Sequence, residues 1–314
     1  MEADFIAWLR SRLPAPPPPS LVVGPGDDAA VFDTSSMPGM VATTDMLMDG
    51  VDFRLNEADP RRIGRKALAV NLSDLAAMGA EPMAALVSLS LPRSGGFALA
   101  RELYEGLLPL AEEFGASIAG GDTNAWDGPL VISVTALGRT TARGPLLRSG
   151  AKPGDAVVVT GELGGSILGK HFDFAPRVRE AIALAARYKI HAAMDISDGL
   201  LLDLSRLCAE SGCGAEIDLD TVPIAAAANQ LAELRRYDGS GLDHALGDGE
   251  DFELLLALTT EDSIAAQRDQ PLLADYGVRL TPIGRFIAEP GLWEIDAAGM
   301  RRKLEPRGYQ HQFD

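Results

Sequence analysis

The string MDISDGLLLDL, residues 194–204, sets two aspartates and a serine directly before a leucine-rich run. A helix is predicted from Gly199 to Glu210, so these polar residues lie where the chain enters it. A similar string, Asn71-Leu72-Ser73-Asp74, occurs in the first half of the chain. Four residues are too few to establish a repeat, but the pair indicates that both halves place similar chemistry at similar points.

Strand-like and helical segments alternate along the rest of the chain. Strands are predicted at 40–44, 83–91, 117–119, 130–138, 156–160, 252–258 and 279–287, and helices at 60–78, 97–114, 163–168, 177–187 and 199–210. A proline run, 14–19, follows a small predicted N-terminal helix. The turn-rich segment from Thr140 to Asp155 is the best domain boundary. We therefore predict a two-domain α/β (α+β) protein, with domains at 1–142 and 143–314.

The acidic composition of the chain argues against some classes of binding partner. The chain has 314 residues with 45 acidic and 28 basic side chains, so its formal net charge is −17. Nucleic acid and anionic membranes call for a positive patch, so neither is expected as a partner. We expect no signal peptide, because residues 1–13 have no basic region followed by an apolar core, and no membrane span, because no apolar run approaches about 20 residues. Cys208 and Cys213 are interpreted as reduced thiols of a cytoplasmic protein.

The aspartates gather in short strings that are otherwise glycine-rich or apolar. These strings lie at residues 26–31, 43–45, 71–74, 120–123, 195–199 and 247–251. Any one of them is typical of a helix cap or a turn. Several carboxylates that converge at the ends of apolar segments would repel one another unless a cation lies between them. Because Mg²⁺ takes a few carboxylates and bridges phosphates, the strings together predict a magnesium site that handles phosphate.

Two glycine-rich segments are candidates for binding phosphate. GGSILGKH, residues 164–171, fits G-x-x-x-x-G-K, but His171 stands where a P-loop has its Mg²⁺-binding hydroxyl. We also predict a helix there, so we do not predict a P-loop. Gly120-Gly121-Asp122 is the better candidate, because two glycines allow close approach of the backbone to a phosphate. Arg148, in the boundary segment, is either a nucleotide ligand or a solvated loop residue.

Taken in order, the strings resemble those of the thiamine-monophosphate kinase family, within the aminoimidazole-ribonucleotide-synthetase-like superfamily. The resemblance rests on GDDAAV (26–31), TTDMLMDGVDF (43–53), NLSDLAAMGAEP (71–82), GGDT (120–123), RSGAKPGD (148–155), MDISDGLLLDL (194–204), GDGEDFELL (247–255) and PRGYQHQF (306–313). It implies ATP-dependent phosphorylation of thiamine monophosphate to thiamine diphosphate. It also implies a homodimer: the N-terminal domain binds ATP and metal and pairs its mixed sheet into a shared barrel, and the C-terminal α/β domain closes the active-site cleft.

The resemblance also implies roles for individual residues. The ligands of several Mg²⁺ ions would be Asp28, Thr43, Thr44, Asp45, Asp74, Asp122, Asp195 and Asp198. ATP would contact Tyr104, Gly121, Asp122, Arg148 and Ser197, and thiamine monophosphate would contact Asp52, Glu250 and Tyr309. The family usually has His where this chain has Asp52, and an acid there would repel the acceptor phosphate. Asp248 stands where the motif commonly has Gly.

The chemistry that the resemblance implies needs no general base. The acceptor oxygen is already anionic, so the task is to align the two phosphates and neutralise their charge. We therefore assign no catalytic residue and expect direct in-line transfer assisted by Mg²⁺. Two alternatives remain: a related ATP-dependent synthetase or kinase that acts on another small substrate, and a non-enzymatic divalent-metal-binding module.

Overall fold

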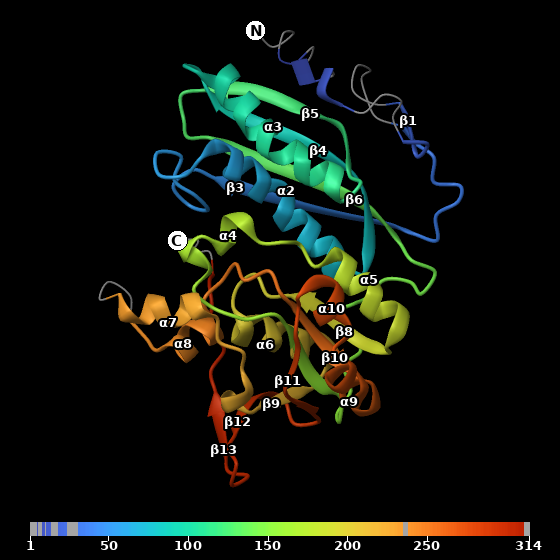
Figure 1. Cartoon of the computed structure of the whole chain (residues 1–314), viewed down its shortest axis with the longest axis vertical. Helices are drawn as coiled ribbons and strands as arrows, with labels where there is room; N and C mark the ends of the chain where they lie inside the picture. Colours follow the sequence, from blue (N-terminus) through green and yellow to red (C-terminus); the bar gives the residue numbers. More distant parts are fainter. Residues whose placement is uncertain are drawn as a thin grey trace. The chain divides into compact units, whose positions relative to one another are not determined.

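The chain divides into two compact units. The computed structural model describes residues 5, 8–9, 11–13, 18–23, 31–234 and 238–310. One unit consists of Met1–Leu75 and Ala80–Gly144, and the other of Ala76–Gly79 and Pro145–Asp314. Both combine helices with a mixed β-sheet, which confirms the predicted fold class (Figure 1). The roles given to residues 1–142 and 143–314 stay predictions.

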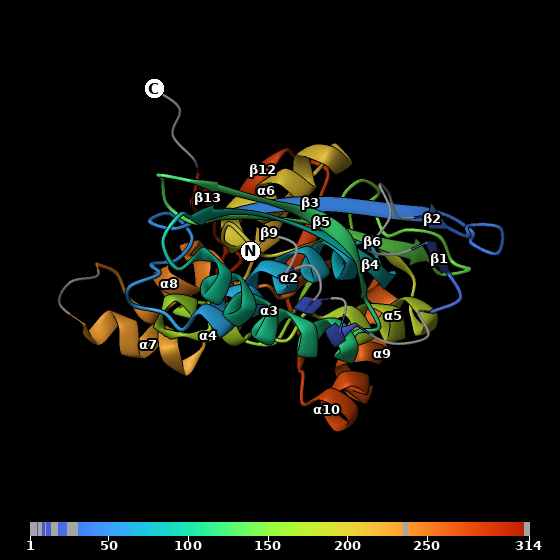
Figure 2. The same cartoon turned by 90° about the horizontal axis from the view of Figure 1, so that it is seen from above.

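The first unit is built on a sheet with the strand order β3-β6-β4-β5 in its described part. The elements are β1 (Leu21–Val23), β2 (Val31–Phe32), β3 (Met40–Met48), α2 (Pro60–Ala77), β4 (Ala80–Pro92), α3 (Gly96–Glu113), β5 (Ser117–Trp126) and β6 (Val131–Thr140). Strands β4 and β5 are parallel, and the other neighbours in this sheet are antiparallel. Helices α2 and α3 lie on the same side of the sheet (Figure 2). This arrangement leaves alternate residues of β3 exposed.

Two helical glycines set the distance between α2 and α3. A Cβ atom on Gly64 would lie 1.9 Å from the carbonyl oxygen of Leu103, and one on Gly106 would lie 1.7 Å from that of Arg61. Glycine inside a helix is normally unfavourable relative to alanine. Here it allows the two helix backbones to touch, which fixes the position of α2 on the sheet.

The second unit contains a longer sheet with the described strand order β13-β12-β9-β11-β7-β10-β8. The strands are β7 (Ala156–Thr160), β8 (Ile190–Asp195), β9 (Gly214–Ile217), β10 (Leu254–Leu258), β11 (Leu280–Ile287), β12 (Gly291–Ile295) and β13 (Arg301–Leu304). The helices are η1 (Ser166–Leu168), α4 (Lys170–Asp173), α5 (Val178–Arg187), α6 (Leu200–Ser211), η2 (Leu219–Thr221), α7 (Ala226–Glu233), α8 (Gly241–Gly247), α9 (Thr260–Asp269) and α10 (Pro271–Tyr276). Its core joins residues such as Val157, Leu204, Leu207 and Phe286, all fully buried.

The predicted helix at 163–168 is wrong. Gly164 and Gly165 have φ angles of 89° and 75°, a left-handed conformation that cannot continue a right-handed helix. Only the short 3₁₀ turn Ser166–Leu168 forms, and α4 follows it. Strand β5 extends past the predicted 117–119 as far as Trp126. No helix of the described chain is long and apolar enough to span a bilayer.

The helix crossing yields a test of the first unit. We predict that Gly106→Ala lowers the free energy of unfolding by about 2 kcal/mol or more, because the methyl group would overlap the Arg61 carbonyl. Chemical denaturation measures this loss. The control is Ala98→Gly, at an exposed position of the same helix, which should cost only about 1 kcal/mol of helix propensity. A stabilising effect of Gly106→Ala would show that the helices do not touch there.

Candidate functional site

Three aspartates of the first unit interact across β3, α2 and the turn after β3. The pKa of Asp45 is raised to about 7, first by burial and then by the negative charges of Asp74 and Asp52. The hydroxyl of Thr43 donates to Asp74 Oδ2 at 2.5 Å. Like charges held this close are unfavourable until a cation joins them. Thr43, Asp45 and Asp74 therefore supply hard oxygen atoms at a point that favours positive charge.

Thr44 lies apart from this group. Successive strand residues point to opposite faces, so the side chain of Thr44 is on the other side of β3 from those of Thr43 and Asp45. Its hydroxyl donates to the Val134 carbonyl at 3.1 Å and accepts from the Thr135 hydroxyl at 3.1 Å. A metal contact of Thr44 is thus restricted to its backbone carbonyl.

Asp52 forms hydrogen bonds within the turn that follows β3. Its carboxylate accepts the N–H of Met48 at 2.7 Å, and its carbonyl accepts a hydrogen bond from Lys66 Nζ at 2.8 Å. Lys66 is fully buried, so the carbonyl is held from inside the unit. Sequence reasoning missed this lysine, and its signal was a charged residue within the apolar face of a predicted helix.

The predicted ATP contacts of the first unit lie on β5 and α3. Asp122 is exposed on β5 and accepts the N–H of Thr123 at 2.9 Å. Gly121 has a packing role as well, because a Cβ there would lie 1.9 Å from the Val87 carbonyl of β4. Tyr104 of α3 is only 3% exposed, with its ring in edge contact with that of Phe5. A cavity of about 370 Å³ has none of the predicted site residues in its described lining, although Thr123 follows Asp122 along β5 and Ala100 precedes Tyr104 by one turn of α3. It is lined by Phe5, Leu91, Pro92, Arg93, Gly96, Phe97, Ala100, Thr123, Asn124 and Ala125.

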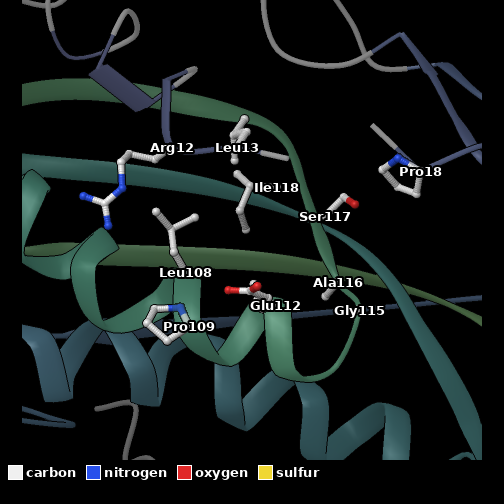
Figure 3. Close-up of a pocket in the computed structure, with 11 residues that line it drawn as sticks. Arg12, Leu13, Pro18, Leu108, Pro109, Glu112, Gly115, Ala116, Ser117 and Ile118 are labelled. Atoms are coloured by element: carbon white, nitrogen blue, oxygen red, sulfur yellow. The ribbon is translucent and has the colours of Figure 1, made fainter. Parts of the chain in front are cut away.

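A second cavity of the first unit, about 630 Å³, contains none of the predicted site residues. It lies beside α3, where Leu108, Pro109 and Glu112 face the start of β5 at Ser117 and Ile118 (Figure 3). Arg12, at its rim, is bound to Glu105 at 2.6 Å. The lining is mostly apolar and offers no set of oxygens for a cation, so we do not assign it to the site.

The second unit places its predicted residues on the loop between β8 and α6. Asp195 ends β8 and is 3% exposed, Ser197 and Asp198 follow, and α6 begins after Gly199. The N–H groups of Ser197 and Asp198 donate to one carboxylate oxygen of Asp203, at 3.0 and 2.9 Å.

Arg206 joins the same loop from the next turn of α6. It donates to Asp198 Oδ2 at 2.5 Å and to Asp203 Oδ1 at 2.8 Å. Sequence reasoning missed both Asp203 and Arg206. The signal available was Asp203 itself, a carboxylate in the middle of the apolar run LLLDL.

The segment 248–253 lies against this loop. Two of its acids, Asp248 and Asp251, have a different role from Glu250. Both carboxylate oxygens of Asp251 accept the N–H of Gly164 at 2.9 Å, and Asp248 accepts that of Gly165 at 3.0 Å. These two acids are therefore caps of the turn at 164–165. Glu250 instead has a φ of 64°, and its N–H donates to the Ser197 carbonyl at 2.7 Å.

The lysine of the P-loop-like string has a different task. Lys170 Nζ donates to Glu253 at 3.0 Å, and Arg177 donates to both oxygens of the same carboxylate at 2.7 Å. Burial favours the protonated form of Glu253, but Lys170 and Arg177 outweigh it and hold the pKa below its usual value. Lys170 is thus part of a buried ion cluster, and no phosphate role is assigned to it.

The remaining predicted residues of the second unit are more exposed. The N–H of Tyr309 donates to the Asp198 carbonyl at 2.8 Å, and its side chain is 50% exposed. The carbonyl of Arg148 accepts from the Ser211 hydroxyl at 2.9 Å, and its side chain lies at the surface.

The donor set fits a cation that shares its ligands with substrate. Within the described ranges, no three or more His, Cys, Asp or Glu side chains form a group that could hold a metal alone. Asp28 lies outside the described residues. Mg²⁺ commonly takes one or two carboxylates and completes its shell with water and phosphate oxygens. The Asp45–Asp74 pair is suited to that mode of binding.

Comparison with known proteins identifies relatives over nearly the whole chain. Residues 26–140 and 152–292 match the N-terminal and C-terminal domains of the AIR synthase related protein family. A thiamine-monophosphate kinase of Rhodopirellula baltica is 45% identical over 318 residues, covering 99% of this chain and 97% of that protein. The crystal structure of thiamine-monophosphate kinase from Stenotrophomonas maltophilia K279a has a TM-score of 0.79 at 34% identity, with 92% of this chain and 95% of that chain covered. A structure described as AaThiL complexed with AMPPCP and TMP has a TM-score of 0.75 at 29% identity, with 91% of each chain covered.

The crowding at Asp45 predicts a stabilising substitution. In the unfolded chain this carboxyl ionises near its ordinary pKa of 3.8, whereas in the fold its pKa is about 7. The metal-free protein therefore loses stability as the pH rises from about 4 to 7. Asp45→Asn should remove this penalty and raise the free energy of unfolding at pH 8 by at most about 4 kcal/mol, and at pH 4 by almost nothing.

Denaturation in the presence of a chelator measures the effect. The matched control is Asp49→Asn, because Asp49 accepts the N–H of Leu55 at 2.9 Å and its loss should not stabilise the fold. If Asp45→Asn is no more stable than the wild-type protein at pH 8, repulsion between these carboxylates does not destabilise the fold.

Proposed function

We propose that this chain, which belongs to the thiamine-monophosphate kinase family, transfers the γ-phosphoryl group of ATP to thiamine monophosphate. The products are thiamine diphosphate and ADP. Membership follows from 45% identity over nearly the full chain and from both matched domains. It removes the alternative of a non-enzymatic metal-binding module, and it disfavours a relative with another substrate.

The cofactor assignment is carried by the grouping of oxygen donors at β3 and α2, where the Thr43 hydroxyl donates to Asp74 and the charges of Asp74 and Asp52 help to raise the pKa of Asp45. Asp45, Asp74 and Thr43 would hold Mg²⁺ in the first unit, while Asp195 and Asp198 would hold it in the second, with Thr44, Asp122 and Asp28 as further ligands. When bound, Mg²⁺ neutralises the phosphate charges and orients the reacting oxygens. The protein residues contribute position rather than covalent chemistry, so we assign no nucleophile and infer direct in-line transfer.

The residues proposed for the nucleotide come from both units. In the first unit the proposed ATP contacts are Gly121, Asp122 and Tyr104. The cavity of about 370 Å³, whose lining includes Thr123 beside Asp122 and Ala100 one turn before Tyr104, has aromatic and apolar residues that suit a base. Because Tyr104 is 3% exposed, we limit its contact to the ring edge or hydroxyl. In the second unit, the exposed Arg148 and the hydroxyl of Ser197 are the proposed phosphate ligands.

The acceptor substrate is assigned to Glu250, Tyr309 and Asp52. Glu250 carries a charge complementary to the thiazolium cation, and the half-exposed Tyr309 offers an aromatic face to it. Because one oxygen of the Asp52 carboxylate already accepts the N–H of Met48, we propose that Asp52 contacts the aminopyrimidine through its other oxygen. We further place the enzyme in the cytoplasm, in keeping with two buried free thiols.

The decisive test is turnover. Incubation of the protein with ATP, Mg²⁺ and thiamine monophosphate should yield thiamine diphosphate by chromatography, with no phosphorylated protein trapped during the reaction. Asp195→Asn should lower kcat by about 100-fold or more, roughly 2.7 kcal/mol in the barrier, while the fold survives. Asp218→Asn, which alters a carboxylate that caps η2, is the control and should retain activity. No product from wild-type protein would refute the function, and a trapped phosphoprotein would refute direct transfer.

We also propose that the enzyme is a homodimer whose N-terminal sheets pair. Strand β3 exposes Met40 and Met46 to 56% and 59%, on a sheet face that α2 and α3 do not occupy. Exposed apolar residues on an edge strand favour pairing with another copy.

Met46→Glu should therefore convert the dimer to a monomer at micromolar concentration, because burying a charge at an apolar interface is costly. Light scattering measures the mass. Met300→Glu, at a 70% exposed position of the second unit, is the control and should leave the mass unchanged. A Met46→Glu protein that keeps the wild-type dimer mass would contradict this interface.

A further inference from the structure

Asp203 is a charged residue in an apolar environment. It lies among the buried leucines of α6, and its exposed fraction is 0%. Burial of a carboxylate costs several kcal/mol unless hydrogen bonds or a countercharge offset it. A leucine at this position would fit the apolar run better. The contacts of the carboxylate therefore have to explain why an aspartate is there.

The hydrogen-bond partners of Asp203 are two residues of the β8–α6 loop and Arg206, which also contacts that loop. One oxygen accepts two successive backbone N–H groups, those of Ser197 at 3.0 Å and Asp198 at 2.9 Å. The other oxygen accepts Arg206 Nη1 at 2.8 Å. Two N–H groups directed at one fixed oxygen restrict the peptide planes on both sides of Ser197, and so restrict the direction of its side chain.

Arg206 extends this restraint to a second side chain. The same Nη1 atom donates to Asp198 Oδ2 at 2.5 Å, so one guanidinium nitrogen bridges the two carboxylates. Within the described chain, these two carboxylates are the only acceptors that Arg206 contacts. Its side chain is 37% exposed and that of Asp198 31%, whereas Asp203 is enclosed. The enclosed carboxylate therefore fixes the cation, and the cation fixes the exposed carboxylate.

The same loop also accepts hydrogen bonds from two other parts of the second unit, at Glu250 and Tyr309. The Ser197 carbonyl accepts the N–H of Glu250 at 2.7 Å, and the Asp198 carbonyl accepts that of Tyr309 at 2.8 Å. A shift of the Ser197–Asp198 peptides would move both acceptors. Through its two N–H partners, Asp203 therefore restrains Ser197 and Asp198 directly. Through their carbonyls it also restrains Glu250 and Tyr309.

We propose that Asp203 is a positioning residue of the reaction. It holds Ser197 and Asp198 through their N–H groups, and Asp198 again through Arg206, in the arrangement that binds nucleotide and divalent cation. Asp203 itself touches neither. The inference rests on the proposed function for the roles of Ser197 and Asp198, while the hydrogen-bond geometry stands independently of it.

The test compares Asp203→Asn with Arg206→Gln, Arg206→Lys and a matched control. Asparagine keeps one acceptor oxygen but turns an NH₂ group toward Arg206, so it should release Asp198 and loosen the loop. Asp262→Asn is the control, because Asp262 also lies in the first turn of a helix, α9, and accepts a backbone N–H, from Lys189 at 2.9 Å. Both aspartate variants should lower Tm by a similar few degrees.

Two readouts separate positioning from stability. Binding of Mn²⁺ with AMPPCP to the full-length protein, followed by electron paramagnetic resonance, should weaken about tenfold in Asp203→Asn and in Arg206→Gln, but not in Asp262→Asn. Arg206→Lys should bind more tightly than Arg206→Gln, because it keeps a cation between the two carboxylates. Amide hydrogen exchange at Ser197 and Asp198 should accelerate in Asp203→Asn while the strands β7 and β10 stay protected.

The outcomes distinguish this inference from the proposed function. Unchanged exchange at Ser197 and Asp198 in Asp203→Asn would refute the geometry. Faster exchange with unchanged Mn²⁺ and AMPPCP binding would refute the positioning role and leave a structural one, and an equal loss in Asp262→Asn would do the same. Absence of thiamine monophosphate turnover by wild-type protein would refute the proposed function alone, because neither readout depends on turnover.

Discussion

Repulsion between the carboxylates of Asp45, Asp74 and Asp52 is the constraint on which the proposed cation site depends. The pKa of Asp45, about 7, shows that the fold holds this group where ionisation is disfavoured. A protein under selection for stability alone would not retain such a group. The proposed Mg²⁺ would convert this repulsion into ligation, and it would draw phosphate to an acidic protein of net charge −17.

Three fully enclosed acids differ from Asp45 in having fixed hydrogen-bond donors. Glu253 meets Lys170 and Arg177, Asp203 meets Arg206 and two N–H groups, and Asp251 meets the Gly164 N–H. Burial still raises the pKa of Asp251 to about 7, so a raised pKa alone does not identify a ligand. What distinguishes Asp45 is that neighbouring carboxylates, rather than donors, contribute most to its shift after burial.

Sequence reasoning was most successful where the pattern is long. Helices α2, α3 and α6 were predicted within two residues, because their apolar positions recur with helical spacing over many turns. The short elements β8, β9, α7 and α8 were missed, since four to eight residues carry little periodicity. The site was harder still. Asp248 and Asp251 lie in one of the aspartate strings that together predicted a magnesium site, but their partners Gly165 and Gly164 are more than eighty residues away. Only the folded chain shows that they are caps. The strained φ of Glu250 likewise depends on a distant partner, the Ser197 carbonyl.

If a divalent cation relieves the crowding at Asp45, protons are released when it binds, and this release can be measured. Near pH 7 Asp45 is about half protonated, and ligation must displace that proton. Titration calorimetry of Mg²⁺ with AMPPCP, in two buffers of different ionisation enthalpy, should show release of about half a proton per chain near pH 7 and none near pH 9 beyond that of the nucleotide alone. Loss of this release in Asp45→Asn assigns it to that residue. Tight Mg²⁺ binding without proton release at pH 7, or with equal release in the variant, would contradict the account.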